Sequence, residues 1–145
     1  MAELSMALVQ VEGLKYWIDD ILNATTFDEH ADLRGLHADH RDSEQLFQLR
    51  ELKGIMRKLA DIGGSIEYLF RPVRETGTLH RDGNGEYQTG QGYRYRSGSM
   101  VEFLLADDSG GVPCWTVTKV EHDGEDYYLM GYEDIPMEGL SVRVR

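Results

Sequence analysis

The chain has 145 residues, a length that fits one ordinary domain or two small units that pack together. Apolar residues make up 41% of it and aromatic residues 10%, which is typical of a folded chain and argues against extensive disorder. The formal net charge of -11 is shared by both halves, -5 before Pro72 and -6 from Pro72 onward. Such a chain is repelled by nucleic-acid phosphates unless its few cations gather on one face.

Cysteine usage and hydropathy narrow the class of protein further. The single Cys114 excludes an intrachain disulfide and a zinc site built from several cysteines. The first residues carry no basic segment followed by an apolar core, and no run of eighteen apolar residues occurs anywhere. We therefore expect a cytoplasmic protein that does not associate with membranes.

Two segments of the first half have helical periodicity. Residues 3–22 place apolar side chains at steps of three and four, and so do residues 43–62, with Ser43 as the expected N-cap. Gly63 and Gly64 are expected to break the second helix before a short turn that Pro72 closes. Residues 24–42 between the helices are polar and without periodicity, which predicts a connecting loop.

The second half is built from short alternating segments separated by turns. The Asp82–Gly85 sequence Asp-Gly-Asn-Gly predicts a tight hairpin between residues 78–81 and 86–88. Further strands are expected over 100–105, 114–121, 127–132 and 141–145. About five short strands in ~70 residues describe a small SH3-like barrel, whose closure would leave no bare sheet edges. The predicted fold class is therefore α+β: a helical hairpin at 1–72 followed by a small SH3-like antiparallel β-barrel at 73–145.

Several motifs of the second half resemble a family of small bacterial domains of unknown function from Gram-positive mobile genetic elements. The likeness is carried by Gly77–Leu79, by Trp115–His122, by Tyr127–Gly131 and by Glu138–Val144. The resemblance implies a fold and a genomic setting, and no chemistry. Proteins of such elements often counter host defences, CRISPR systems among them, so the resemblance also implies an anti-CRISPR-like role as one expectation.

Carboxylates are dense in the turns expected between the strands. Projecting carboxylates can imitate phosphates and would be attracted to a basic partner, although Asp also occurs in turns for conformational reasons. The candidate partner-binding residues are Asp107, Asp108, Glu121, Asp123, Glu125, Asp126, Glu133 and Asp134, with Glu138 nearby in sequence.

An alternative site interleaves aromatic and basic residues, as in surfaces that stack bases and hold phosphates. Its candidates are Tyr93, Arg94, Tyr95 and Arg96, with Arg143 and Arg145 as additional cations. The charge of the surrounding half opposes this interpretation, and small barrels commonly use tyrosines in their core and rim.

Two features could support chemistry. His30, His37 and His40 lie among aspartates in the loop and could ligate a metal, but their spacing matches no established motif, so a solvated loop is favoured. Cys114 begins a strand where alternation predicts burial, and no histidine is placed beside it by the sequence. We therefore expect no catalytic residues, no metal and no cofactor. A metal-dependent enzyme that uses these histidines is a third hypothesis, after protein binding and nucleic-acid binding.

Together these observations predict a non-enzymatic accessory binding protein of a mobile genetic element. Its sharpest form is an acidic inhibitor that blocks the basic nucleic-acid groove of a host defence nuclease such as a CRISPR effector. The rival form is a nucleic-acid-binding regulator that uses the Arg and Tyr residues of the second half. The helical half is expected to be a docking arm, which forms a homodimer if the second half does not cover its apolar stripe.

Overall fold

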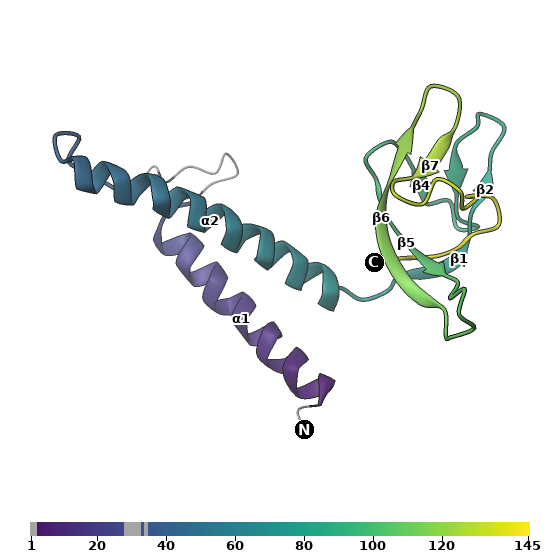
Figure 1. Ribbon diagram of the computed structural model, residues 1–145, viewed down its shortest axis with the longest axis horizontal. Coiled ribbons are helices and arrows are strands. Elements are labelled where there is room, and N and C mark those ends of the chain that lie inside the picture. The colour runs from purple at the N-terminus through teal and green to yellow at the C-terminus, as the bar shows by residue number, and fades with distance from the viewer. Residues whose placement is uncertain (1–2, 28–32, 34) are drawn as a thin grey trace. The chain divides into compact units, whose positions relative to one another are not determined.

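The computed structural model describes residues 3–27, 33 and 35–145 and confirms the α+β class. The chain divides into two compact units, Met1–Arg71 and Pro72–Arg145. The first unit contains two helices and the second contains the strands (Figure 1). Within the described residues, neither helix has an apolar stretch long enough to cross a bilayer.

The two helices run in opposite directions along their contact. Helix α1 covers Leu4–Ala24 and helix α2 covers Ser43–Phe70. Just beyond the end of α1, the Thr25 hydroxyl donates to the sulfur of Met56 at 3.6 Å, whereas one to two turns earlier Ile18 lies against Gly63. The earlier residue of α2, Met56, thus lies at the end of α1, so the two helices are antiparallel. The contact buries Ile18 of α1 and Met56 and Gly63 of α2.

Helix α2 corrects two predictions. Its N-cap is Asp42, whose carboxylate accepts from the backbone N–H of Glu44 at 2.9 Å and of Gln45 at 3.3 Å, so the predicted Ser43 cap is wrong by one residue. The expected break at Gly63 and Gly64 is also wrong, because α2 continues to Phe70. At Gly63 the backbone of α2 lies close to α1, because a Cβ at this position would be 3.3 Å from Ile18 Cγ2.

The second unit contains eight short strands in two antiparallel sheets. The strands are β1 Glu75–Thr78, β2 His80–Arg81, β3 Tyr87–Gln88, β4 Arg94–Tyr95, β5 Met100–Leu105, β6 Cys114–His122, β7 Tyr127–Leu129 and β8 Ser141–Val144. One sheet has the order β1-β8-β5-β6-β7, and the other has the order β2-β3-β4. The predicted hairpin at Asp82–Gly85 is confirmed, since His80 pairs with Gln88 and Arg81 with Tyr87.

Closure of these strands into an SH3-like barrel is not confirmed. All residues of this unit are described, and its five-stranded sheet ends at β1 on one side and at β7 on the other, with the three-stranded sheet separate from it. The two sheets nevertheless share one hydrophobic core, to which both contribute fully buried side chains. Its buried members are Leu79, Tyr87, Tyr95, Val101, Phe103, Val120, Leu129, Met137 and Val142.

Candidate protein-binding surface

Carboxylates from three distant parts of the sequence meet at one end of the second unit. The link is Arg81 of β2, whose guanidinium lies 3.6 Å from the Asp126 carboxylate in the β6–β7 turn. The backbone N–H of Arg81 also donates to Glu138 at 2.7 Å. The β2–β3 turn, the β6–β7 turn and the segment after β7 are thereby held together. We call the resulting group the acidic cluster, and it consists of Asp82, Glu86, Asp123, Glu125, Asp126 and Glu138.

The hairpin turns themselves explain why acidic residues stand at these positions. Asp82 accepts from the backbone N–H of Asn84 at 2.8 Å and of Glu86 at 3.0 Å. Asp123 does the same for Glu125 at 2.8 Å and Asp126 at 2.9 Å. A short side-chain carboxylate that bonds the backbone two or three residues on is a common way to stabilise a turn. The turn residues therefore have a structural role, and that role also fixes where the charges project.

Hydrogen bonds keep two members of the acidic cluster ionised. The backbone N–H groups of Asp126 and then Glu125 lower the pKa of Asp123. The pKa of Glu138 is lowered, first by the backbone N–H of Arg81 and next by the hydrogen bond from His80, whose Nδ1 lies 3.2 Å away. Asp123 and Glu138 consequently keep their negative charge to a lower pH than isolated carboxylates would.

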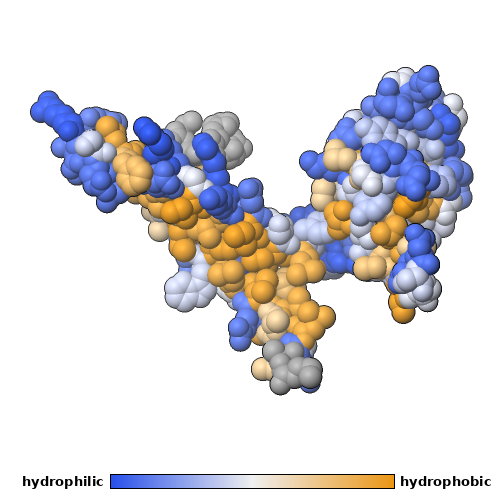
Figure 2. Space-filling model, viewed as in Figure 1, coloured by the Kyte–Doolittle hydropathy of each residue, from blue (hydrophilic) through white to orange (hydrophobic). Residues whose placement is uncertain are grey.

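Cations neutralise the acidic cluster only in part. Arg81 pairs with Asp126, and Arg94 of β4 lies 3.4 Å from Glu86. Of the six carboxylates, Asp126 and Glu86 are thus each paired with a guanidinium, and His80 lies beside Glu138. The hydrophilic upper end of this unit in Figure 2 contains the two hairpin turns. Within this fully described unit, the Glu125 side chain makes neither a hydrogen bond nor an ion pair, so its charge is available to a partner.

The remaining predicted acidic residues lie elsewhere in the unit. Asp107 and Asp108 belong to the β5–β6 loop, at the opposite end of β6 from Asp123. Nine residues of β6 separate the two loops, about 30 Å at the usual rise per strand residue. The Asp107 carboxylate accepts from the Ser109 hydroxyl at 2.6 Å and from its N–H at 2.9 Å, which lowers the pKa of Asp107.

Three further acidic candidates also fall outside the acidic cluster. Glu133 and Asp134 follow β7, where Glu133 accepts from the backbone N–H of Gly131 at 3.2 Å. Glu121 of β6 accepts from the Ser97 hydroxyl at 2.8 Å. The eight predicted residues therefore do not form one surface. Asp82 and Glu86 were not predicted from the sequence as binding residues, although the Asp-Gly-Asn-Gly turn that begins at Asp82 and precedes Glu86 was.

The Arg and Tyr residues of the alternative site are largely committed to the fold. Tyr95 is 1% exposed in the core, and Tyr93 packs edge-on against it with ring centroids 5.0 Å apart. Arg145 donates to Glu102 at 2.9 Å, and Arg143 binds the same carboxylate while its guanidinium lies 4.5 Å from the Trp115 ring centroid. Both guanidiniums bind one buried carboxylate, so they are fixed in the fold and only partly accessible to a phosphate.

The residues considered for chemistry do not assemble into a site. His30 lies outside the described residues, whereas His37 and His40 are exposed. In the part of the chain that the structure describes, no group of three His, Cys, Asp or Glu side chains could hold a metal ion. The predicted burial of Cys114 is wrong: it begins β6 beside the exposed 106–113 loop and is itself exposed.

Comparison with known proteins bears on the second unit only. Residues 77–144 match the model of a family described as a domain of unknown function (DUF5348). The match begins within β1 and ends at the last residue of β8, so it spans both sheets. It confirms that the C-terminal half is similar to a small domain of unknown function. No curated protein and no solved structure matches the chain.

Proposed function

We propose that this chain is a non-enzymatic binding protein whose acidic cluster docks on a basic surface of another protein. The observation that carries the proposal is that Arg81 joins three segments, which together hold six carboxylates and only two ion-paired guanidiniums. Hydrogen bonds within the turns hold several of these carboxylates in place before binding. A partner with clustered lysines and arginines would be steered towards such a surface by long-range attraction.

Pre-positioned carboxylates can occupy sites built for phosphates. Because Asp123 and Glu138 are fixed by backbone N–H groups, little side-chain freedom is lost when a partner guanidinium approaches. The narrower proposal is an inhibitor of a host defence nuclease, such as a CRISPR effector, that blocks its basic nucleic-acid groove. The genomic setting implied by the family resemblance is the additional support for this narrower form.

We further propose that the second unit is a variant of the SH3-like barrel. One core lies between its two sheets, which is the arrangement expected when a barrel is split into halves. The acidic cluster then occupies hairpin turns at one end, where loops can vary without disturbing the core.

Charge-reversal variants at matched sites test the docking proposal. Glu125→Lys changes the acidic cluster, whereas Asp134→Lys makes the same change of net charge away from it. With a ten-residue arginine peptide as probe, Glu125→Lys should slow association roughly 5- to 10-fold more than Asp134→Lys, and added salt should reduce the difference. Equal effects of the two variants would show that only total charge matters and would overturn the docking site.

The nuclease proposal has its own test. The wild-type chain should reduce DNA cleavage by a CRISPR effector nuclease of the host, and Glu125→Lys should restore cleavage. Cluster-dependent binding to the arginine peptide without inhibition of the nuclease would retain the general function and overturn the narrower one.

A further inference from the structure

The helical unit leaves large apolar side chains uncovered. Ile18, Met56 and Ile66 are buried between the helices, but other large apolar residues of both helices are 37–74% exposed. Figure 2 shows a continuous apolar area over α1 and the C-terminal part of α2. We call six of these residues the apolar face: Leu14, Trp17 and Ile21 of α1, and Ile55, Ile62 and Leu69 of α2.

The exposed residues of the two helices lie on the same side of the helix pair. A groove of about 340 Å³ on this side is lined by Val11 of α1 and by Ile62, Ile66 and Leu69 of α2, and Asp61 and Ser65 of α2 also belong to its lining. Residues Leu14 and Ile21 follow Val11 at steps that keep them on this side of α1. On α2, Ile55, Ile62 and Leu69 are spaced by seven residues and therefore form one line along the helix.

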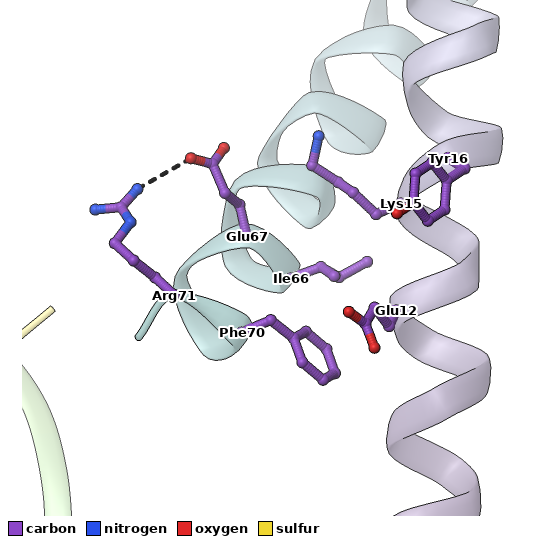
Figure 3. Close-up of a pocket in the computed structure, with 7 residues that line it drawn as sticks. All are labelled: Glu12, Lys15, Tyr16, Ile66, Glu67, Phe70 and Arg71. Carbon is purple, nitrogen blue, oxygen red and sulfur yellow. Dashed lines mark hydrogen bonds and ion pairs between the residues drawn. The ribbon is translucent and has the colours of Figure 1, made fainter. Parts of the chain in front are cut away.

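The opposite side of the helix pair carries more charged side chains. Glu12 and Tyr16 of α1 share a groove of about 300 Å³ with Phe70, Glu67 and Arg71 of α2 (Figure 3). Charged groups stand around its rim, and its cations are already paired: Arg71 with Glu67 at 3.1 Å, and Lys15 with Asp19 at 2.6 Å. The helix pair as a whole is thus amphipathic, with charge on one side and the apolar face on the other.

We propose that a second copy of this chain covers the apolar face, so that two helix pairs form a four-helix bundle. The spacing along α2 supports a helical partner, because apolar residues recur alternately after three and four residues. The positions are Leu52, Ile55, Leu59, Ile62, Ile66 and Leu69. This spacing is the same from either end. Ile66 of this series is buried against α1, so the exposed Ile55, Ile62 and Leu69 make the contact. Two copies of α2 placed antiparallel, with a two-fold axis at Ile62, oppose Ile62 with its own copy and Ile55 with Leu69.

Size and charge are compatible with this symmetric pairing. The 21 residues of α1 span about 30 Å, and two helices packed 8–10 Å apart make a face about 20 Å wide. Such an area is comparable with the roughly 800 Å² that each partner contributes to a stable complex. Beside the α2 line, Glu51 and Lys58 have opposite signs, and Asp61 of the groove adds one carboxylate per chain. Lys58 therefore offsets part of the negative charge where two acidic chains meet.

Sedimentation equilibrium of the full chain tests the dimer. We expect twice the monomer mass of 16.5 kDa for the wild type. Leu14→Glu and Ile62→Glu should raise the dissociation constant about 100-fold or more, because each would bury an unpaired charge. Val9→Glu is the matched control, since Val9 is 68% exposed but lies about 140° around α1 from Leu14. The control should remain dimeric.

The dimer proposal can fail independently of the acidic cluster. If dissociation also melts the helices, the helical circular dichroism of the wild type and its mass should fall together on dilution, which would support the proposal. A wild-type chain that is monomeric and fully helical at every concentration would overturn it. A dimer that withstands both Leu14→Glu and Ile62→Glu would overturn the assigned face.

Discussion

Glu102 is the charged residue that the fold depends on most directly. It lies in the middle of β5, is 4% exposed, and is covered by Arg143 and Arg145 of the neighbouring C-terminal segment. Arg143 is also its register partner on β8. A carboxylate with two guanidinium partners is tolerated in this position because its oxygens are satisfied and its charge is compensated.

Replacing Glu102 should therefore be costly. We expect Glu102→Gln to lower the free energy of unfolding by about 3 kcal/mol, because two partly buried guanidiniums lose their counter-charge. Denaturant unfolding followed by Trp115 fluorescence, in a Trp17→Phe background, measures this in the second unit alone. Glu121→Gln is the control, since its amide oxygen can still accept from the Ser97 hydroxyl and only the charge is lost, so it should cost no more than about 1 kcal/mol. Equal losses would contradict the role of Glu102.

Glu138 makes a pH-dependent contribution whose sign follows from its hydrogen bonds. Its pKa in the folded chain is lowered below the ordinary value of 4.5, chiefly by the backbone N–H of Arg81. The ionised form therefore stabilises the fold above about pH 4.5, and this stabilisation disappears as the pH falls through the lower folded value.

Glu138→Gln should consequently be less stable than the wild type at neutral pH, and the difference should shrink as the pH falls below about 4.5 and through the lower folded pKa. Thermal unfolding of both proteins across this range measures the effect. Glu125→Gln removes a carboxylate without a hydrogen bond and serves as the comparison. A difference between the Glu138 variant and the wild type that grows in acid would show that the Arg81–Glu138 bond does not act as described.

At the scale of the elements, two adjacent glycines of α2 have different surroundings. A Cβ at Gly63 would meet Ile18 at 3.3 Å, whereas a Cβ at Gly64 would have no neighbour within 4 Å. Gly64→Ala should stabilise the helical unit by up to about 1 kcal/mol, because alanine loses less backbone entropy in a helix. Gly63→Ala should gain less, and Gly63→Leu should force α1 away. Helical circular dichroism during denaturation ranks the three variants, and identical effects of both alanines would contradict the close approach.

The glycine pair shows what the sequence could and could not predict. Helical periodicity and the Asp-Gly-Asn-Gly turn are local signals, and the helices and the β2–β3 hairpin were predicted from them. Continuation of α2 through Gly63 depends on Ile18, 45 positions away in the chain, and no local signal contains that contact. The acidic cluster depends in the same way on Arg81 bringing Asp126 and Glu138 together.

The alternation of apolar and polar residues along a strand also failed to predict the burial of two side chains, Cys114 and Glu102. Strand alternation predicts burial for Cys114, but its register partner Leu105 is the last residue of β5, so no further strand residue covers it. Conversely, alternation places Glu102 on the outward side of β5, where Arg143 and Arg145 cover it.

At the scale of the whole molecule, the two units should respond differently to protein concentration. If the apolar face is buried in a dimer, only unfolding of the helical unit is linked to association. Raising the concentration about 100-fold should add up to roughly 2.7 kcal/mol to that unit and leave the second unit unchanged. Circular dichroism for the helices and Trp115 fluorescence for the strands, in a Trp17→Phe background, separate the two transitions. A concentration-dependent β transition would contradict this division.

The contact between α1 and α2 also has a consequence for local opening. Because Thr25, just past the end of α1, already lies at Met56, the first thirteen residues of α2 extend beyond α1 (Figure 1). That segment is about 20 Å long at 1.5 Å per residue. Its backbone amides should exchange with solvent deuterium faster than those of residues 56–70, which pack against α1. A single continuous helix therefore contains a labile first half and a protected second half, with the transition near Met56.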